Sequence, residues 1–420
     1  MLEIIRSSDT KAIGKLLRAR STTLAEAEAV VRPILEDIRR RGDRALLRYA
    51  KKFDRLDFAM TGLTVSREEI RRAYREVPRG FVAAVRVAAA NIRKAARKQL
   101  PRMWTCNTSA GVRVGQIIRP LERVACYVPG GRFPLPSTVL MSVIPAQEAG
   151  VSEVIVTSPR PAPAVLVAAD LLGVKKIYRL GGAQAIAAFA FGTESVPRVD
   201  KIVGPGNRYV AAAKKLVAGE CGIDFIAGPS ELVLVGGRGN AEWIASDLVA
   251  QAEHDPEALA IFITTRADLA KDVVQNVNAR SANNAVASEA LDKNGLVILL
   301  SSVEEARAIT NRLAPEHLTV DTAADLDWVQ NAGSVFVGRW SAQPMGDYIS
   351  GPNHTLPTGG MARVRGGLSV NDFVKLITVQ KYSSQAMRVL GPPAALLAEA
   401  EGLIGHAEAI RTRLTRRTRG

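Results

Sequence analysis

The chain has 420 residues, of which 47% are apolar and 23% are charged, a composition typical of globular proteins and a length that favours two or three domains. Its net charge of +15 comes with only 5% aromatic residues and with no zinc knuckle, RNP-like motif or convincing helix-turn-helix, so we expect no nucleic-acid partner. The first residues contain no apolar signal-peptide core, and no apolar run is long enough to cross a bilayer, so we expect no membrane partner. The three cysteines are widely spaced, form no disulfide framework and fit a reducing cytoplasm.

Residues 1 to about 100 carry apolar side chains at three-to-four spacing, which predicts helices. The pattern changes at Val124, after which short β-branched runs such as VSEVIVTS and ELVLVGG alternate with alanine-rich stretches such as AQAIAAFAFG. This alternation predicts parallel sheets with helices on both faces. We therefore expect an α/β fold of doubly wound domains.

Glycine-rich loops adjoin four of the apolar runs, in the segments YVPGGR, GGAQA, GPGNRY and AGPSE. Doubly wound sheets bind ligands at the carboxyl ends of their strands, and we expect all four loops at such ends. Glycine lets the backbone approach a ligand closely, so four loops of this kind suggest an extended ligand such as a dinucleotide. The nearest match to the GxGxxG fingerprint, from Gly204 to Tyr209, lacks the third glycine, so a nucleotide would bind outside the standard phosphate loop.

The segment 241–254 is predicted to be a helix with one polar residue, Gln251, in the middle of its apolar stripe. Asp247 and His254 lie at the edge of the same stripe. Buried polar groups cost roughly 1–3 kcal/mol each unless they find partners, and a metal ion is a candidate partner. A hydrogen-bonded pair in the core is the alternative explanation.

Proton transfer is the chemistry that the segment NRLAPEHL suggests. Pro315 disfavours helix at the preceding residue and leaves Glu316 and His317 in an extended turn. An acid and a base at adjacent positions can divide proton transfers between them. The alternative is a helix end at which His317 compensates the dipole.

Further reactive side chains lie in polar or glycine-rich surroundings. Asp347 follows a glycine soon after the predicted strand SVFVG, and His354 lies in a turn rich in glycine and proline, where a purely structural role is the alternative. Glu401 and His406 flank the helix breaker GLIG, and we expect them at a bend. Cys126 is a conceivable nucleophile for an aldehyde, although an isolated cysteine in an apolar run more often packs in the core.

Taken together, these segments resemble those of histidinol dehydrogenases. The resemblance covers nearly the whole chain in the same order and rests on YVPGG (127–131), GGAQAIAAFAFGTESVPRVDKIVGPGN (181–207), IDFIAGPSE (223–231), DLVAQAEHDP (247–256), RLAPEHL (312–318), GDYISGPNHTLPTGG (346–360), GLSVNDF (367–373) and AEAEGLIGH (398–406). The stretch NIRKAARKQ (91–99) lacks an aromatic–histidine pair that we expect of relatives, but it contains none of the residues that the resemblance assigns to the site.

The resemblance implies a cytoplasmic homodimer that uses Zn²⁺ and NAD⁺ to oxidise L-histidinol to L-histidine through the aldehyde, with two NAD⁺ reduced. Glu316 and His317 match the family's catalytic pair. The residues that match its zinc ligands are Gln251, His254, Asp347 and His406, the last of them supplied across the dimer. The residues that match its substrate contacts are these four with Ser230, His317 and Glu401, and those that match its NAD⁺ contacts are Tyr127, Gln184 and Asn207.

We expect an α/β fold with two Rossmann-like doubly wound domains and helical N-terminal and C-terminal segments. The expected boundaries are an N-terminal segment at 1–21, a larger domain at 22–126 plus 230–370, an inserted NAD-side domain at 127–229 and a dimerisation segment at 371–420. One alternative is a paralogous NAD-dependent dehydrogenase of another small hydroxylated substrate, such as a sulfonated diol, and another is a regulatory protein on an inactive scaffold. The intact Glu401 and His406 weigh against the first alternative, and the complete set of candidate site residues weighs against the second.

Overall fold

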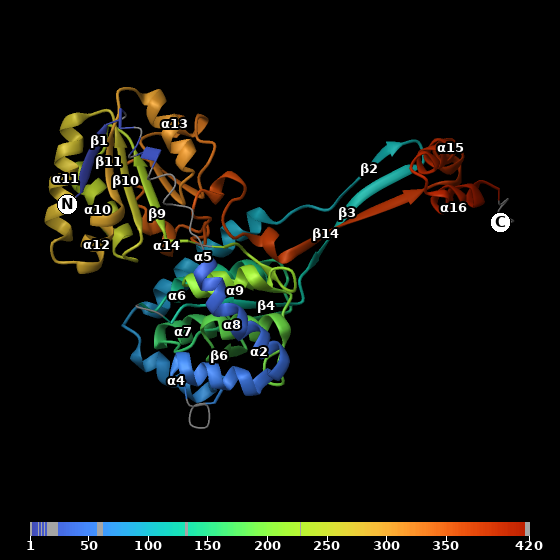
Figure 1. Cartoon of the computed structure of the whole chain (residues 1–420), viewed down its shortest axis with the longest axis horizontal. Helices are drawn as coiled ribbons and strands as arrows, with labels where there is room; N and C mark the ends of the chain where they lie inside the picture. The colour runs from blue at the N-terminus through green and yellow to red at the C-terminus, as the bar shows by residue number, and fades with distance from the viewer. Residues whose placement is uncertain are drawn as a thin grey trace. The chain divides into compact units, whose positions relative to one another are not determined.

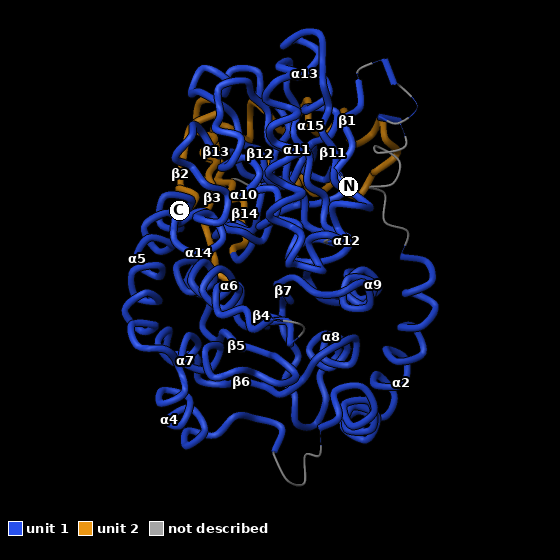
Figure 2. The backbone as a smooth tube through the Cα atoms, turned by 90° about the vertical axis from the view of Figure 1, so that its left-hand side faces the viewer, with its two compact units in different colours: residues 1–99, 121–373 blue, residues 100–120, 374–420 orange. Residues whose placement is uncertain are grey.

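The computed structural model describes residues 2–6, 8, 9, 11, 13, 14, 24–56, 62–130, 133–226 and 228–415. The chain forms two compact units (Figure 2): unit 1 is Met1–Gln99 with Leu121–Phe373, and unit 2 is Leu100–Pro120 with Val374–Gly420. Two parallel sheets with their helices make up unit 1, whereas unit 2 contains an antiparallel sheet and two helices. No helix within the described ranges is long and apolar enough to cross a membrane.

The larger sheet of unit 1 has six parallel strands in the order β1-β11-β10-β9-β12-β13. These strands are β1 (Glu3–Arg6), β9 (Glu231–Val235), β10 (Leu259–Thr264), β11 (Gly295–Leu299), β12 (His317–Val320) and β13 (Ser334–Val337). One face packs against α10 (Ala241–Ala252), α11 (Ala267–Ser281) and α12 (Ala285–Asn294), and the other against α13 (Val303–Leu313) (Figure 1). Alternate residues of β10 serve the two faces, since Phe262 belongs to the first core and Ile261 to the second.

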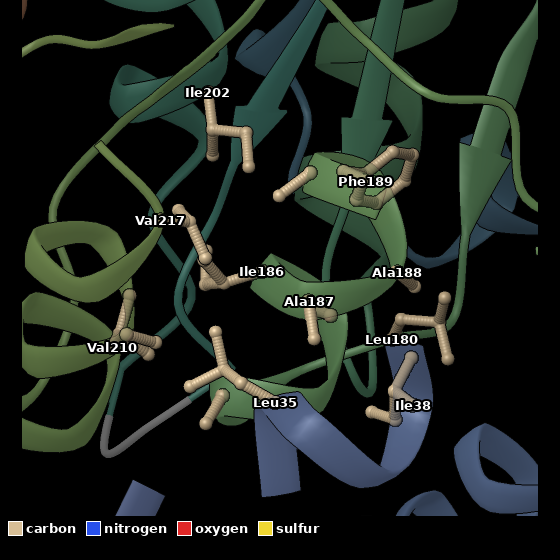
Figure 3. Packing of buried hydrophobic residues seen from close by; sticks show 14 of the residues in the cluster. Leu35, Ile38, Leu180, Ile186, Ala187, Ala188, Phe189, Ile202, Val210 and Val217 are labelled. Atoms are coloured by element: carbon tan, nitrogen blue, oxygen red, sulfur yellow. The ribbon is translucent and has the colours of Figure 1, made fainter. Parts of the chain in front are cut away.

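The smaller sheet of unit 1 has five parallel strands in the order β6-β5-β4-β7-β8. These are β4 (Arg123–Tyr127), β5 (Glu153–Thr157), β6 (Lys176–Tyr178), β7 (Lys201–Val203) and β8 (Gly222–Ile223). One core lies under α4 (Arg67–Glu76), α5 (Phe81–Gln99), α6 (Pro136–Glu148) and α7 (Pro163–Leu171), and the other under α2 (Ala25–Tyr49), α8 (Gly182–Phe191) and α9 (Arg208–Val217). Figure 3 shows the second core, in which Leu35 and Ile38 of α2 lie beside α8.

Unit 2 is built on a three-stranded antiparallel sheet in the order β14-β3-β2. Its elements are β2 (Trp104–Ser109), β3 (Val112–Pro120), β14 (Val374–Tyr382), α15 (Ser384–Ala400) and α16 (Ile404–Thr415). The two helices pack against each other, and Gly402, at a φ of 77°, forms the bend between them. This bend confirms the helix break predicted at GLIG.

The α/β fold with two Rossmann-like doubly wound sheets is confirmed, and the C-terminal segment contains the helices α15 and α16. Most of the expected helical N-terminal segment, 1–21, lies outside the described residues. The structure differs from the expectation in two places. The prediction of helices throughout residues 1–100 is wrong for Glu3–Arg6, which forms the edge strand β1. Four residues are too few to show a period, and this strand depends on β11, which lies far along the chain. Val374–Tyr382 is likewise a strand within the predicted helical C-terminal segment, because it pairs with β3 along its whole length.

The domain boundaries expected from the sequence stay a prediction. In the structure, α2, α4 and α5, which were expected with the 230–370 segment, contribute to the two cores of the five-stranded sheet. Amphipathic helices without a sheet of their own do not reveal in sequence which sheet will bury their apolar face.

Phe189 tests the core between α2, α8 and the five-stranded sheet. Its ring is fully buried and meets Tyr178 edge-to-face at 5.4 Å. We expect Phe189→Ala to lower the free energy of unfolding by about 3–5 kcal/mol, because it removes a large buried ring and leaves a cavity. Urea unfolding followed by circular dichroism measures this loss. Phe133→Ala is the control, since Phe133 is 51% exposed, and an equal loss in both variants would contradict the prediction.

Candidate active site

The polar motifs of the larger sheet gather at the amino ends of three neighbouring strands. Ser230 directly precedes β9, Glu316 directly precedes β12, and the segment that contains Gln251 and His254 leads into β10. The segment AGPSE (227–231) joins the two sheets, because it follows the carboxyl end of β8, as the sequence suggests, and leads into the amino end of β9. In parallel sheets the loops gather at both ends of the strands, and the chemistry here uses the loops that enter the strands instead of those that leave them.

Six of the predicted site residues line one cavity of about 170 Å³ within unit 1. They are Ser230, Gln251, His254, Glu316, His317 and Asp347. The same cavity is lined by Pro205 and Phe225, which follow β7 and β8 of the smaller sheet. Residues that lie more than 100 positions apart in the chain thus surround a space suited to a small molecule.

His317 begins β12 and is held in one tautomer by the backbone of the neighbouring strand. Its Nδ1 lies 3.2 Å from the carbonyl oxygen of Glu231. A carbonyl only accepts hydrogen bonds, so Nδ1 carries the proton and Nε2 is left with its lone pair. This Nε2 lies 3.7 Å from Oδ1 of Asp347. Burial lowers the pKa of the His317 imidazole to about 4, against the opposing effect of Asp347, so the ring is neutral and can accept a proton.

Glu316 is a buried carboxyl group whose position is also set by Glu231. The backbone N–H of Glu231 donates to Oε2 of Glu316 at 2.8 Å. Burial raises the pKa of the Glu316 carboxyl well above its usual value, and the nearby charges of Glu231 and Asp347 act in the same direction. The local backbone agrees with the sequence prediction, because α13 ends before Ala314, which adopts a left-handed φ of 46°.

Asp347 lies in α14 (Pro344–Tyr348), and both its carboxylate oxygens and its backbone carbonyl oxygen have identified neighbours. The side-chain amide of Gln343 donates to Oδ2 at 2.9 Å, which leaves Oδ1 toward His317. Nδ1 of His354 lies 2.8 Å from the Asp347 carbonyl oxygen and therefore donates to it. His354, for which the sequence left a structural role open, also lines the cavity.

The side chain of Gln251 indicates that the cavity is suited to a ligand that can bind polar groups. Its side chain is 1% exposed, and neither Oε1 nor Nε2 has a hydrogen-bond partner in the part of the chain that the structure describes. An unpartnered buried amide is costly. Together with the imidazole of His254 and the carboxylate of Asp347, which line the same cavity, its oxygen would form part of a set of nitrogen and oxygen ligands that suits a transition metal.

The metal-binding set is incomplete within unit 1. Among the described residues, no three or more histidine, cysteine, aspartate or glutamate side chains are grouped so that they could hold a metal ion. The predicted set supplies only His254 and Asp347 of these residue types from unit 1. His406 and Glu401 belong to unit 2, where both are exposed.

The three predicted nucleotide residues lie at carboxyl ends of the smaller sheet. Tyr127 ends β4, Gln184 lies in the first turn of α8, and Asn207 caps the N-terminus of α9. From β4 the chain proceeds outward through β5 and β6 and then returns to β7 on the other side of β4. The crevice between β4 and β7 is thus a topological switch point, the place where doubly wound sheets bind nucleotides.

Hydrogen bonds fix each of these three side chains. The Tyr127 hydroxyl accepts from the backbone N–H of Gly182 at 3.1 Å, and the Gln184 amide donates to Asp54 at 2.9 Å. Oδ1 of Asn207 accepts from two backbone N–H groups of the first turn of α9. Tyr127 and Gln184 are buried, whereas Asn207 is exposed, so the exposed cap of α9 fits contact with a nucleotide and the two buried side chains hold the backbone around the switch point.

Some features of the site differ from what the sequence suggested or were not foreseen. Cys126 is fully buried, points into the core under α6, and burial raises the pKa of its thiol to about 12, so packing explains it. Gln343 was missed, although its position four residues before Asp347 is the spacing at which side chains on one helical turn meet. Phe225 was also missed, because no sequence pattern brings the end of β8 to the other sheet.

Comparison with known proteins gives the family. A family model described as histidinol dehydrogenase matches residues 17–414 of this chain. The chain belongs to the histidinol dehydrogenase family. It is 45% identical to the histidinol dehydrogenase of Geobacter sulfurreducens, over 93% of this chain and 94% of that protein, and 45% identical to that of Bacillus thuringiensis, over 95% of each. The crystal structure of histidinol dehydrogenase from Elizabethkingia anophelis superposes with a TM-score of 0.93 and covers 98% of both chains at 37% identity.

Membership of the histidinol dehydrogenase family makes this chain an oxidoreductase that acts on a small molecule. This agrees with histidinol oxidation in histidine biosynthesis. The cavity that collects Ser230, Gln251, His254, Glu316, His317 and Asp347 is the candidate for its active site.

The unpartnered amide of Gln251 makes a testable difference to stability. We expect Gln251→Leu to raise the free energy of unfolding of the metal-free protein by about 1–3 kcal/mol, because it removes a buried polar group that has no hydrogen bond. Urea unfolding in the presence of a chelator measures this change. Gln147→Leu is the matched control, since the Gln147 amide donates to the Leu172 carbonyl at 2.7 Å and its loss should lower stability. A drop in both variants would show that Gln251 has a partner after all.

Proposed function

We propose that this enzyme oxidises L-histidinol to L-histidine through L-histidinaldehyde and reduces two NAD⁺ in the course of the reaction. We further propose that it acts as a cytoplasmic, Zn²⁺-dependent homodimer. The observation that carries the proposal is the arrangement of His317, whose Nε2 keeps its lone pair in a cavity that also contains the unpartnered amide of Gln251. Oxidation of an alcohol at a metal requires a base that takes the hydroxyl proton and side chains that bind the metal. His317 and Gln251 would supply these two functions in one small cavity.

The residues that would hold zinc are Gln251, His254 and Asp347, with His406 of the partner subunit as the fourth. Zinc would supply a Lewis acid that holds the imidazole and amine nitrogens of the substrate in place. The unpaired amide of Gln251 and the Asp347 oxygen that Gln343 leaves unoccupied support this assignment. Ser230 and Glu401 would complete the substrate contacts.

Tyr127, Gln184 and Asn207 would hold NAD⁺, which would accept a hydride in each of the two oxidation steps. Their position at the switch point between β4 and β7 supports this assignment. Pro205 lies in the chain between the end of β7 and Asn207, and it also lines the substrate cavity. A dinucleotide bound at the crevice would thus have one end near the substrate.

His317 would act as the base in the alcohol oxidation. The hydroxyl group must lose its proton as the hydride leaves, and Nε2 of His317 would accept that proton. The carbonyl of Glu231 keeps Nδ1 protonated throughout, so that the proton can only be taken up at Nε2. Proton transfer of this kind contributes roughly 10²–10⁴-fold in rate.

Glu316 would act in the second half of the reaction. The aldehyde must be hydrated before a second hydride can leave, and the Glu316 carboxylate would take a proton from the attacking water. Its Oε2 is already oriented by the backbone of Glu231. Burial makes this carboxylate a stronger base than one in water, because its pKa is raised.

A direct assay tests the proposal. We expect the purified protein to convert L-histidinol to L-histidine with two NADH formed per substrate, as followed by NADH absorbance. A chelator should abolish the reaction, and added Zn²⁺ should restore it. A folded, zinc-loaded sample that does not oxidise histidinol but oxidises another small alcohol would overturn the substrate assignment.

Replacing the catalytic pair separates chemistry from folding. We expect His317→Ala and Glu316→Gln each to lower kcat by roughly 10²–10⁴-fold, while circular dichroism and bound zinc stay as in the wild type. Glu304→Gln, on the exposed first turn of α13, is the control and should keep full activity. Wild-type rates in either active-site variant would remove that residue from the mechanism.

Gln343 provides a test that does not depend on turnover. Because its amide holds Oδ2 of Asp347, Gln343→Met should weaken zinc binding by about 10–100-fold, the usual effect of losing a group that orients a metal ligand. Competition with a chromophoric chelator measures this affinity. Ser341→Ala removes a different hydrogen bond of the same loop, to the Val337 carbonyl, and should leave the affinity unchanged. Equal zinc affinities in all three proteins would be the contradictory result.

A further inference from the structure

A buried ion pair joins α9 to the residue that follows β8. Lys214 of α9 contacts Asp224, and their side chains are only 3% and 1% exposed. Removing two charges from water is costly, and apolar residues of similar size usually give equal or greater stability than such a pair. A contribution to stability is therefore a weak explanation for this pair, and the groups that it contacts suggest another.

Both members of the pair hold the peptide groups of one glycine. The backbone N–H of Gly204 donates to Oδ2 of Asp224 at 2.8 Å, and Nζ of Lys214 donates to the Gly204 carbonyl at 3.0 Å. Gly204 has a φ of 116°, and a Cβ there would lie 2.2 Å from the carbonyl oxygen of Tyr127. This residue is thus fixed in a conformation that only glycine adopts readily, directly before Pro205 and close to Asn207.

The same carboxylate also positions a wall of the substrate cavity. Oδ1 of Asp224 accepts from the backbone N–H of Phe225 at 2.7 Å, and Phe225 lines the cavity together with Pro205. The guanidinium group of Arg365 lies 4.5 Å from the centre of the Phe225 ring and donates to the Asp224 carbonyl. Asp224 therefore connects the loop after β7 with the cavity.

We propose that Lys214 and Asp224 are positioning residues for NAD⁺. They hold the loop from Gly204 to Asn207 in the shape that receives the dinucleotide at the switch point between β4 and β7. Their charged groups are engaged with each other and with the peptide groups of Gly204, so both side chains act on the loop and not on the ligand. This inference rests on the proposed function, since it takes NAD⁺ as the ligand of that crevice.

The test compares two substitutions on one helix. In Lys214→Met, we expect the Kd for NAD⁺, measured by isothermal titration calorimetry, to rise ~10-fold or more. The KM for NAD⁺ should rise in proportion, whereas zinc content and the KM for histidinol should stay within about twofold of the wild type. Lys215→Met is the matched control, because Lys215 is half-exposed and pairs with Glu28 at the surface, at 2.6 Å. It should bind NAD⁺ like the wild type.

Two further variants keep the test decisive if the lone Asp224 charge prevents folding of Lys214→Met. Lys214→Met combined with Asp224→Asn removes both charges of the pair and the lysine bond to the Gly204 carbonyl. The amide at position 224 keeps one acceptor oxygen in place of the two that receive the N–H groups of Gly204 and Phe225. We expect this double variant to fold and to bind NAD⁺ more weakly than the wild type. Lys214→Arg restores the charge and should recover part of the affinity.

The outcomes separate this inference from the proposed function. Wild-type NAD⁺ affinity in folded Lys214→Met, or in the double variant, overturns the positioning role, even if the melting temperature falls. A wild-type protein that binds no NAD⁺ overturns the proposed function and this inference with it.

Discussion

The candidate active site depends on the register of β9 against β12. The backbone of Glu231 in β9 donates to the carboxylate of Glu316 and accepts from the imidazole of His317, so one residue orients both proposed catalytic side chains. This is possible because His317 pairs with Leu232, the residue after Glu231. A shift of one position would turn every side chain of the strand to the opposite face. The hydrophobic pattern that sets this register therefore also sets the orientation of the Glu316 and His317 side chains.

The two sheets of unit 1 contribute to the site in opposite ways. The larger sheet presents the amino ends of β9, β10 and β12, whose loops carry acids, bases and amides. The smaller sheet presents carboxyl ends, where glycine-rich loops surround a switch point. Pro205 and Phe225, which follow strands of the smaller sheet, line the same cavity as the polar residues of the larger sheet. Each sheet retains a continuous apolar core, because the polar residues are confined to loops at the strand ends.

Much of this could be predicted from the sequence, and the failures have physical reasons. Alternating strands and helices gave the doubly wound fold, and Gln251 stood out because a polar residue interrupted an apolar stripe. The sequence did not show which end of the larger sheet would carry the site, since loops at both ends of a parallel strand look alike. Short strands such as β1 and long-range contacts such as that between Lys214 and Asp224 were also beyond it, because only the folded chain brings their partners together.

The position of β1 has a consequence for the order in which the chain is completed during synthesis. Ile4 pairs with Val297, so β1 is synthesised almost 300 residues before the strand that it pairs with. The five-stranded sheet and its helices, in contrast, are contained in a single stretch from α2 to β8. The five-stranded sheet can therefore form before the six-stranded one, and β1 has no partner strand until β11 has been synthesised, a period in which its edge is open to other chains.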